Sequence, residues 1–277
     1  MRYFIALTFL VLQASPPAQS GPIVPNFPDT TIKTRSTHGL QSVTVTTLML
    51  KGGLVRRQTG PDGSSVPPSM VQITQCDQAR TVMLMTFNKT FHNMPIHAYP
   101  RPAGNVAVVN RFVRTPAGSQ GRPEVTITTD SEDTRERRNV GSFQARHIKT
   151  TITVEPGPGA LTPSGKTKVD GWYFDVPGLN CSDEETPGPV AIVGWHVPMM
   201  QHGHDSFKYV HNGVQHLGYA IEEAYKEKSA HNIVINKTEL VDFSDKPLEP
   251  SLFEIPADYT EAPVPRMVGQ PAVPAKQ

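Results

Sequence analysis

Half of the ten histidines lie between residues 196 and 216 of the 277-residue chain. In this stretch His202 and His204 flank a single glycine, and Asp205 follows directly. Neutral imidazoles and carboxylates are ligands that suit Zn²⁺ or Cu²⁺. One hypothesis is therefore a zinc or copper site, with these candidate ligands: His202, His204, His211 and His216. The spacing matches no established metal motif, so a polar loop that happens to contain histidines is the interpretation that the sequence favours.

Two carboxylates could serve as the acid and base of a hydrolase. Asp170 and Asp175 flank a Gly-Trp-Tyr-Phe run. Residues five apart on a strand face opposite sides of the sheet, so these two carboxylates would not converge on one bond. The sequence also has no Gly-x-Ser-x-Gly motif and no phosphate-binding loop. These observations favour a protein that is not an enzyme and leave an unrecognised hydrolase as an alternative.

Basic side chains cluster in one segment, with neighbouring acidic residues that offset their charge. The cluster consists of Arg135, Arg137, Arg138, Arg146, His147 and Lys149. A solvated hairpin is the favoured interpretation, and a rim that contacts anionic headgroups is the alternative. The formal net charge of the chain is only +1, with 18% charged residues, which gives no electrostatic case for a nucleic-acid partner.

The first twenty residues resemble a secretory signal peptide. Met1-Arg2 precedes the apolar run Tyr3–Leu12, and Ala18-Gln19-Ser20 offers a small-residue cleavage site. The apolar run is about half as long as a bilayer-spanning helix. No later segment reaches the roughly eighteen apolar residues that such a helix needs. We therefore expect cleavage, no transmembrane segment afterwards, and a periplasmic or secreted protein. In such an oxidising compartment, Cys76 and Cys181 are predicted to form a disulfide.

The remaining chain is predicted to be mainly β, an antiparallel meander or half-barrel with few short helices. Alternating β-branched and apolar residues predict strands at 42–50, 54–58, 71–76, 80–87, 124–129, 144–154, 168–176 and 232–243. Residues 130–138 are expected to form a charged turn, 217–228 either a helix or a strand, and 250–253 a one-turn helix. The predicted organisation is a signal peptide at 1–20, a Pro/Thr-rich leader at 21–41 that contains a first strand at most, a β-rich domain at 42–259 with a His-rich insertion near 187–217, and a disordered tail at 260–277.

Several stretches resemble a family of exported bacterial proteins of unknown function that is common in acidobacteria. They are Ile73–Asp77, Asp133–Arg137, Gly141–Thr151, Asp170–Asp175 and the ending Asp242–Pro256. Some members have been likened to the LolA and LolB type of periplasmic lipoprotein carrier. The resemblance implies export and an antiparallel half-barrel around a hydrophobic ligand cavity, and it implies no catalytic residue. Where the family pattern has Gly in an Asp-Thr-Gly-Glu-Arg turn, this chain has Arg135, which predicts a wider turn.

The function predicted from these features is that of a non-enzymatic envelope protein that binds an apolar or lipid-like ligand. A periplasmic metal-binding module that uses the His-rich loop is the alternative, and apart from Zn or Cu no cofactor is expected. Eight apolar residues are expected to line the cavity: Val43, Val45, Val82, Leu84, Ile148, Ile152, Trp172 and Phe174. Each of them could equally be ordinary core.

Overall fold

The computed structural model describes residues 24–38, 42–63, 68–96, 121–176, 179, 181, 205–214, 217–228 and 233–263. Within these residues the chain forms a single sheet of thirteen strands and one 3₁₀ turn, η2 (Pro250–Phe253). The first six strands are β1 (Phe27–His38), β2 (Ser42–Gly52), β3 (Leu54–Pro61), β4 (Met70–Gln75), β5 (Arg80–Met85) and β6 (Thr90–Pro95). The others are β7 (Glu124–Val140), β8 (Phe143–Pro156), β9 (Gly165–Phe174), β10 (Ser206–Gly213), β11 (Tyr219–Lys228), β12 (Ile233–Ser244) and β13 (Thr260–Glu261).

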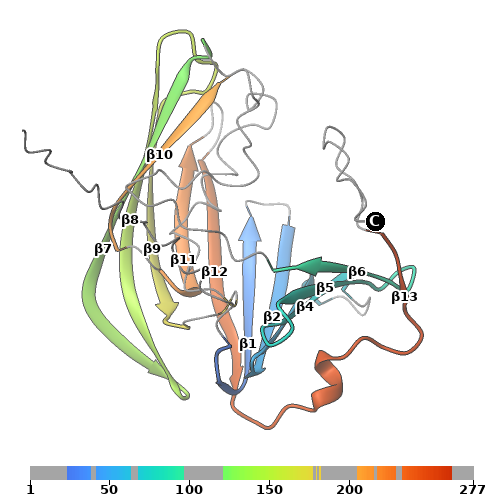
Figure 1. Cartoon of the computed structure of the whole chain (residues 1–277). Coiled ribbons are helices and arrows are strands. Elements are labelled where there is room, and N and C mark those ends of the chain that lie inside the picture. The colour runs from blue at the N-terminus through green and yellow to red at the C-terminus, as the bar shows by residue number, and fades with distance from the viewer. Residues whose placement is uncertain are drawn as a thin grey trace, which may run out of the picture.

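The sheet is open and almost entirely antiparallel, as the sequence predicts. Its strand order is β10-β7-β8-β9-β11-β12-β1-β2-β3-β4-β5-β6-β13. The two outermost pairs, β10 with β7 and β13 with β6, are parallel. Figure 1 shows β7, β8 and β9 standing upright on one side, whereas β4, β5 and β6 lie almost across them on the other. The sheet therefore bends strongly between its two halves.

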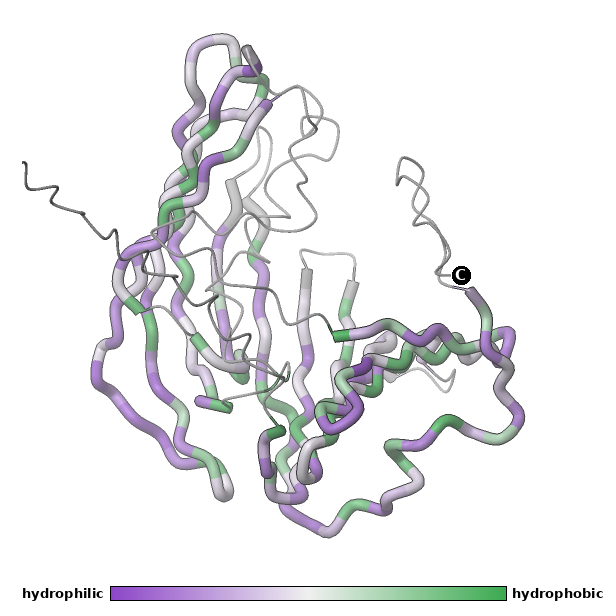
Figure 2. Tube along the Cα trace, in the orientation of Figure 1, coloured by the Kyte–Doolittle hydropathy of each residue, from purple (hydrophilic) through white to green (hydrophobic). Residues whose placement is uncertain are grey.

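Hydrophobic and hydrophilic residues alternate along most strands (Figure 2), so most strands have one apolar and one polar side. The largest core cluster combines β1 and β2 residues, such as Ile32 and Leu48, with Phe174 of β9. The rings of Phe143, Phe174 and Phe243 contact one another with centroid distances of 5.4 to 6.2 Å. This core joins strands that are several positions apart in the sheet, so the bend brings them together.

A second apolar cluster lies at the other end of the sheet, where Val82 and Leu84 of β5 pack with Val71 and Ile73 of β4. The 3₁₀ turn contributes Phe253, which is buried in this cluster. The one-turn helix predicted at 250–253 is confirmed in its position.

The sheet begins at Phe27, inside the segment for which the sequence predicts a leader or at most a first strand. Strand β1 pairs along most of its length with β12 on one side and β2 on the other. Thr30, Ile32 and Thr34 share one face of this strand and are buried, whereas the residues between them are more exposed. The prolines that suggested a leader, Pro25 and Pro28, lie before and at the irregular start of the strand, where few ladder hydrogen bonds are lost.

Two further boundaries differ from the prediction, and one open alternative is decided. Residues 206–213, which were expected in the His-rich insertion, form strand β10. Residues 219–228, for which the sequence left a helix and a strand as alternatives, form a strand, because β9 and β12 pair with them on both sides. Residues 260–261 extend the sheet as β13, two residues into the predicted disordered tail.

The charged turn predicted at 130–138 is also wrong. Strand β7 continues through this segment, and the hairpin turns at Gly141, which has a φ of +56°. The ladder between β7 and β8 is interrupted between Asp133 and Arg137, which is a bulge. Arg135 stands in this bulge with a φ of +68°, a conformation that favours glycine. The irregularity is thus a bulge inside a strand, and the chain does not reverse there.

Replacing Arg135 by glycine should stabilise the protein by about 1 kcal/mol, because a side chain in the left-handed conformation costs about that much. The bulge itself should persist, since the Asp133 carboxylate accepts a hydrogen bond from the Arg135 backbone N–H at 2.7 Å. Urea unfolding measures the change, and Arg135→Ala is the control because it keeps a Cβ at this position. Equal stabilities of the glycine and alanine variants would contradict the prediction.

No helix in the described ranges is long and apolar enough to span a membrane.

Candidate functional site on the outer face of the sheet

The predicted disulfide between Cys76 and Cys181 is confirmed. The two Cα atoms are 5.1 Å apart, the sulfur atoms are bonded, and both residues are buried. Cys76 follows β4, whereas Cys181 lies beyond the end of β9. The bridge therefore links two parts of the chain whose strands are far apart in the sheet.

The predicted metal ligands are not brought together by the described part of the structure. His202, His204 and His216 lie outside the described residues. His211 lies on β10, and its Nε2 atom is 2.7 Å from the backbone oxygen of Val214. No group of three or more potential metal ligands occurs among the residues that the structure describes.

The eight residues predicted to line a cavity do not form one surface. Trp172 and Phe174 belong to the largest cluster, whereas Ile152 and Ile148 belong to two others. Val82 and Leu84 pack in the cluster around η2. Val43 is 40% exposed and Val45 is half-buried. The reason is the sheet register: Ile148 pairs with Gly171, so Ile148 lies on the opposite face from Trp172.

The register defines two faces on strands β8, β9, β11 and β12. Directly paired residues lie on the same face, and the pairs run across these strands in continuous rows. We call outer face the one that carries His147, Lys149, Lys168, Asp170, Trp172, Glu222, Ala224, Lys226, Ile235 and Lys237. Most of these side chains are exposed or half-exposed, whereas the other face, the inner face, carries mainly buried residues.

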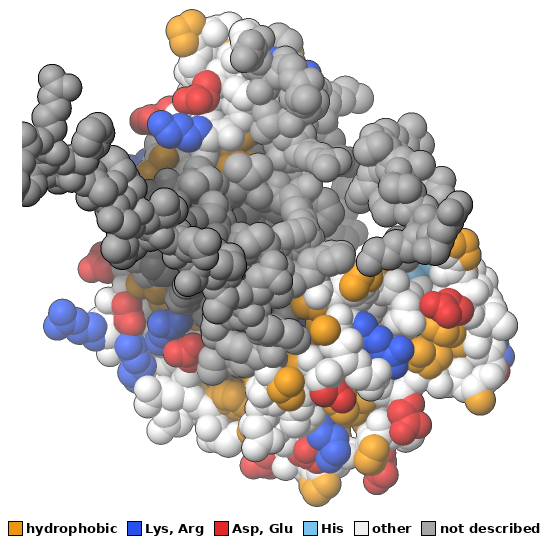
Figure 3. All heavy atoms as spheres, viewed as in Figure 1, with side chains coloured by type: hydrophobic (Ala, Val, Ile, Leu, Met, Phe, Trp, Pro, Cys, Tyr) orange, Lys and Arg blue, Asp and Glu red, His pale blue; other side chains and the backbone are white. Residues whose placement is uncertain are grey.

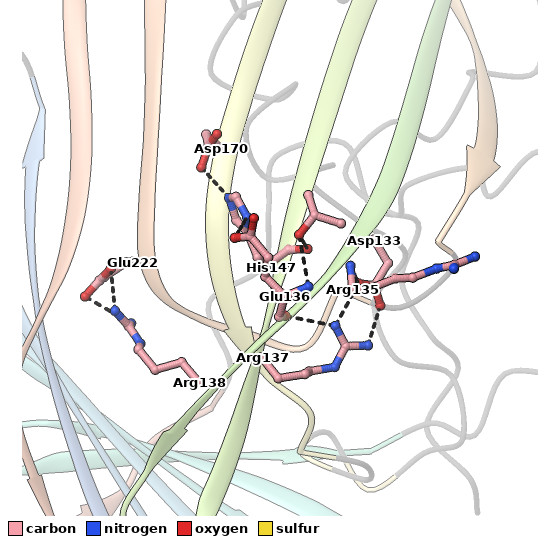
Figure 4. Close-up of polar contacts among 9 residues, drawn as sticks. Asp133, Arg135, Glu136, Arg137, Arg138, His147, Asp170 and Glu222 are labelled. Carbon is pink, nitrogen blue, oxygen red and sulfur yellow. Dashed lines mark hydrogen bonds and ion pairs between the residues drawn. The ribbon is translucent and has the colours of Figure 1, made fainter.

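On the outer face His147 is held between two carboxylates (Figure 4). Its Nδ1 atom is 2.8 Å from Glu136 Oε2, and its Nε2 atom is 2.7 Å from Asp170 Oδ1. The ring stacks on Trp172 with a centroid distance of 4.9 Å. The imidazole is buried, whereas the side chains of Glu136 and Asp170 are 63% and 59% exposed. The bulge in β7 moves Glu136 into reach of the ring, so the irregular backbone and the histidine belong to one arrangement.

Both ring nitrogens of His147 thus have a carboxylate oxygen within hydrogen-bond distance. The cluster can therefore hold the Asp170 carboxylate in a fixed place on β9.

The neighbouring arginines are paired with acids. Arg137 binds both oxygens of Asp133 at 2.8 Å. Arg138 forms an ion pair with Glu222 at 3.0 Å, and its guanidinium lies 4.8 Å from the centroid of the Trp172 ring. Acidic and basic side chains are also interspersed on the face that Figure 3 shows. The predicted interpretation as a charge-balanced, solvated hairpin fits these pairings better than a rim for anionic headgroups.

Next to the His147 cluster the outer face contains a groove of about 490 Å³. Its lining residues are Lys166, Lys168, Ala224, Tyr225, Lys226 and Ile235. Asp170 pairs with Ala224, so the cluster and the groove meet at this row of the sheet. Ile235 pairs directly with Lys226 and is 54% exposed, which is unusual for such a large apolar side chain.

The groove lies where β9 and β11 part. Their ladder ends at the pair Tyr225 and Val169, although both strands continue. The next position would place Lys226 directly opposite Lys168. Like charges on directly opposed residues destabilise pairing, which gives a physical reason for the separation of the two strands.

The inner face carries a half-buried acid, Glu223, at the same level of the sheet. The hydroxyl of Tyr173 donates a hydrogen bond to Glu223 Oε2 at 2.7 Å. Burial raises the pKa of the Glu223 carboxyl, and the bond from Tyr173 offsets part of that rise. Burial also raises the pKa of Tyr173 well above its usual value, with a further contribution from Glu223.

Replacing Glu223 by glutamine should stabilise the protein at neutral pH by about 1 kcal/mol. This is the lower end of the free-energy cost of burying a polar group that has one hydrogen-bond partner. A raised carboxyl pKa in the folded state favours its protonated form. The protonated Glu223 carboxyl makes its full contribution to stability below the pKa of about 4.3 that it has in the unfolded chain. This contribution is lost as the pH rises through the higher pKa that the carboxyl has in the folded protein. Urea unfolding from pH 4 to 8 should therefore show a gain for Glu223→Gln that grows with pH, whereas Glu155→Gln, on an exposed residue, should show none. A gain that does not depend on pH would contradict the assignment.

The sequence analysis missed the three groove lysines. Lys166 and Lys168 alternate at the start of one strand, and Lys226 stands near the end of another. Alternating lysines at strand ends were a visible signal, but only the pairing of β9 with β11 shows that these ends are neighbours.

Comparisons with known proteins give no family. No family model matches the chain, and no curated protein matches it. Among solved structures, the chain is similar to one described as an uncharacterized conserved protein from Thermus thermophilus. The two are 6% identical, the match covers 86% of this chain and 91% of that chain, and the TM-score is 0.37.

Proposed function

We propose that this protein is exported and binds an apolar or lipid-like ligand without catalysing a reaction. The observation that carries the proposal is the groove between β9 and β11. Its volume of about 490 Å³ lies within the range of small-molecule sites. Ala224 and the exposed Ile235 give it an apolar surface next to a polar rim.

Export is supported by two features. The N-terminal segment has the pattern of a signal peptide. The Cys76–Cys181 disulfide is typical of an oxidising compartment outside the cytoplasm.

Native mass spectrometry of the protein purified from its own cell envelope tests the proposal. We expect a mature chain that begins near residue 21, with a bound apolar molecule of defined mass. Ile235→Asp should reduce the bound fraction by about tenfold, because a carboxylate replaces the exposed apolar surface of the groove. Val241→Asp is the matched control, since Val241 is an exposed apolar residue on the same strand but outside the groove. A ligand-free protein, or equal loss in both variants, would contradict the proposal.

A further inference from the structure

The groove combines apolar surface with positive charge. Three ammonium groups, on Lys166, Lys168 and Lys226, line it together with Ile235. No carboxylate residue is among its lining residues. Within the described part of the chain these three lysines form no ion pair, in contrast to Lys51, Lys89 and Lys237.

The positions of the lysines concentrate their charge at the mouth of the gap. Lys168 and Lys226 stand at opposed positions on strands that have just separated, and Lys166 is two residues further along β9. The two lysines of β9 and Lys226 of β11 therefore face the same space from its two sides. Such a concentration of one sign of charge attracts an anion, and the low-dielectric wall that Ile235 and Ala224 provide strengthens the attraction.

The nearest acid on this face is Asp170, which is two residues from Lys168 on the same strand. His147 binds its carboxylate at 2.7 Å, on the side of the Trp172 cluster. This contact directs the negative charge of Asp170 to the histidine. The lysines of the groove are thereby left without an acid from their own strand.

We infer that the groove binds a long-chain anionic amphiphile of the fatty-carboxylate type. The carboxylate head would lie among Lys166, Lys168 and Lys226, and the chain would lie along Ala224 and Ile235. This inference rests on the proposed function, because it names the chemical class of the ligand for the same groove. Charge complementarity favours this occupant over a neutral lipid, and the exposed isoleucine favours it over a small inorganic anion.

Isothermal titration of the mature protein with three probes below their micelle concentrations tests the inference. The probes are dodecanoate, the neutral glycerol monoester of the same fatty acid, and inorganic phosphate. We expect dodecanoate to bind at least about tenfold more tightly than the neutral ester, and to weaken as salt is raised, because screening reduces the attraction of the lysines. Phosphate should bind more weakly than dodecanoate by at least a similar factor.

The double variant Lys168→Gln/Lys226→Gln separates charge from apolar contact. It should weaken dodecanoate binding about tenfold or more and leave the affinity for the neutral ester within about twofold. The control, Lys208→Gln/Lys246→Gln, removes the same charge from exposed positions outside the groove and should leave both affinities unchanged. Circular dichroism of both double variants verifies that the sheet is retained.

The outcomes distinguish this inference from the proposed function. Equal affinity for dodecanoate and the neutral ester, or no effect of the groove variant, would overturn the anionic ligand class and leave binding of an apolar ligand standing. Phosphate that binds as tightly as dodecanoate would overturn the amphiphile. Failure of both amphiphiles to bind would overturn the proposed function together with the inference.

Discussion

Loss of the Cys76–Cys181 disulfide should lower the free energy of unfolding by about 4 to 5 kcal/mol. The bridge joins residues 105 apart in the sequence, so it removes a large amount of conformational freedom from the unfolded chain. Because typical domains have only about 5 to 15 kcal/mol of stability, a loss of this size would leave the sheet marginally stable. Urea unfolding of Cys76→Ser/Cys181→Ser, compared with the oxidised protein, measures the effect.

The reduced natural protein is the control for this experiment. It should unfold at nearly the same urea concentration as the double serine variant, because both lack the same cross-link. The single variant Cys76→Ser should match them, with Cys181 as a free thiol. A loss below about 1 kcal/mol would show that the unfolded chain is already compact around these residues, so that the cross-link restricts it little.

Replacing Asp205 by alanine should destabilise the protein by about 3 kcal/mol. The Asp205 side chain is buried directly before β10 and accepts hydrogen bonds from three donors in the loop between β8 and β9. These are the backbone N–H of Leu161 at 3.1 Å, the backbone N–H of Thr162 at 2.8 Å and the Thr162 hydroxyl at 2.6 Å. The substitution would leave these donors buried without an acceptor, and an unsatisfied buried donor costs more free energy than the loss of an exposed hydrogen bond.

The companion variant Thr162→Val removes only one of the donors. It should cost about 1 kcal/mol, since both backbone bonds to Asp205 remain. Urea unfolding measures both changes, and hydrogen exchange of the β10 amides should rise in Asp205→Ala, because this carboxylate ties the start of the edge strand to the loop. Equal losses in the two variants would show that the backbone donors find water when the carboxylate is absent.

The local pattern predicted most strands correctly. Segments such as 42–50 and 144–154 alternate β-branched or apolar residues with polar ones, and this period of two is a property of each strand by itself. For β1 it was indecisive, because prolines and threonines suggested a leader or at most a first strand. It failed at 130–138, where dense charge suggested a turn, because the bulge at Arg135 permits one strand to continue through that segment.

The candidate site was only partly visible in the sequence. Glu136, His147, Asp170 and Trp172 all lie in the stretches that carry the family resemblance, but no local rule assembles them around one imidazole. The groove was not predicted at all. It depends on two strand ends, at Lys168 and Lys226, that are separated by more than fifty residues in the chain and face each other across a gap.

The sequence by itself therefore determined the mainly β class, the positions of most strands, and the pairing of the two cysteines, since a protein with two cysteines offers one intramolecular pair. The tertiary structure decided which strands are neighbours. One example is the pairing of β1 with β12, where the Ser36 and Thr238 hydroxyls form a hydrogen bond of 3.0 Å. The tertiary structure also decided which face each side chain occupies. The physical reason is that a strand satisfies its backbone hydrogen bonds with partners of any sequence separation, so the register that places lysines, acids and Ile235 on one face is set by the whole sheet.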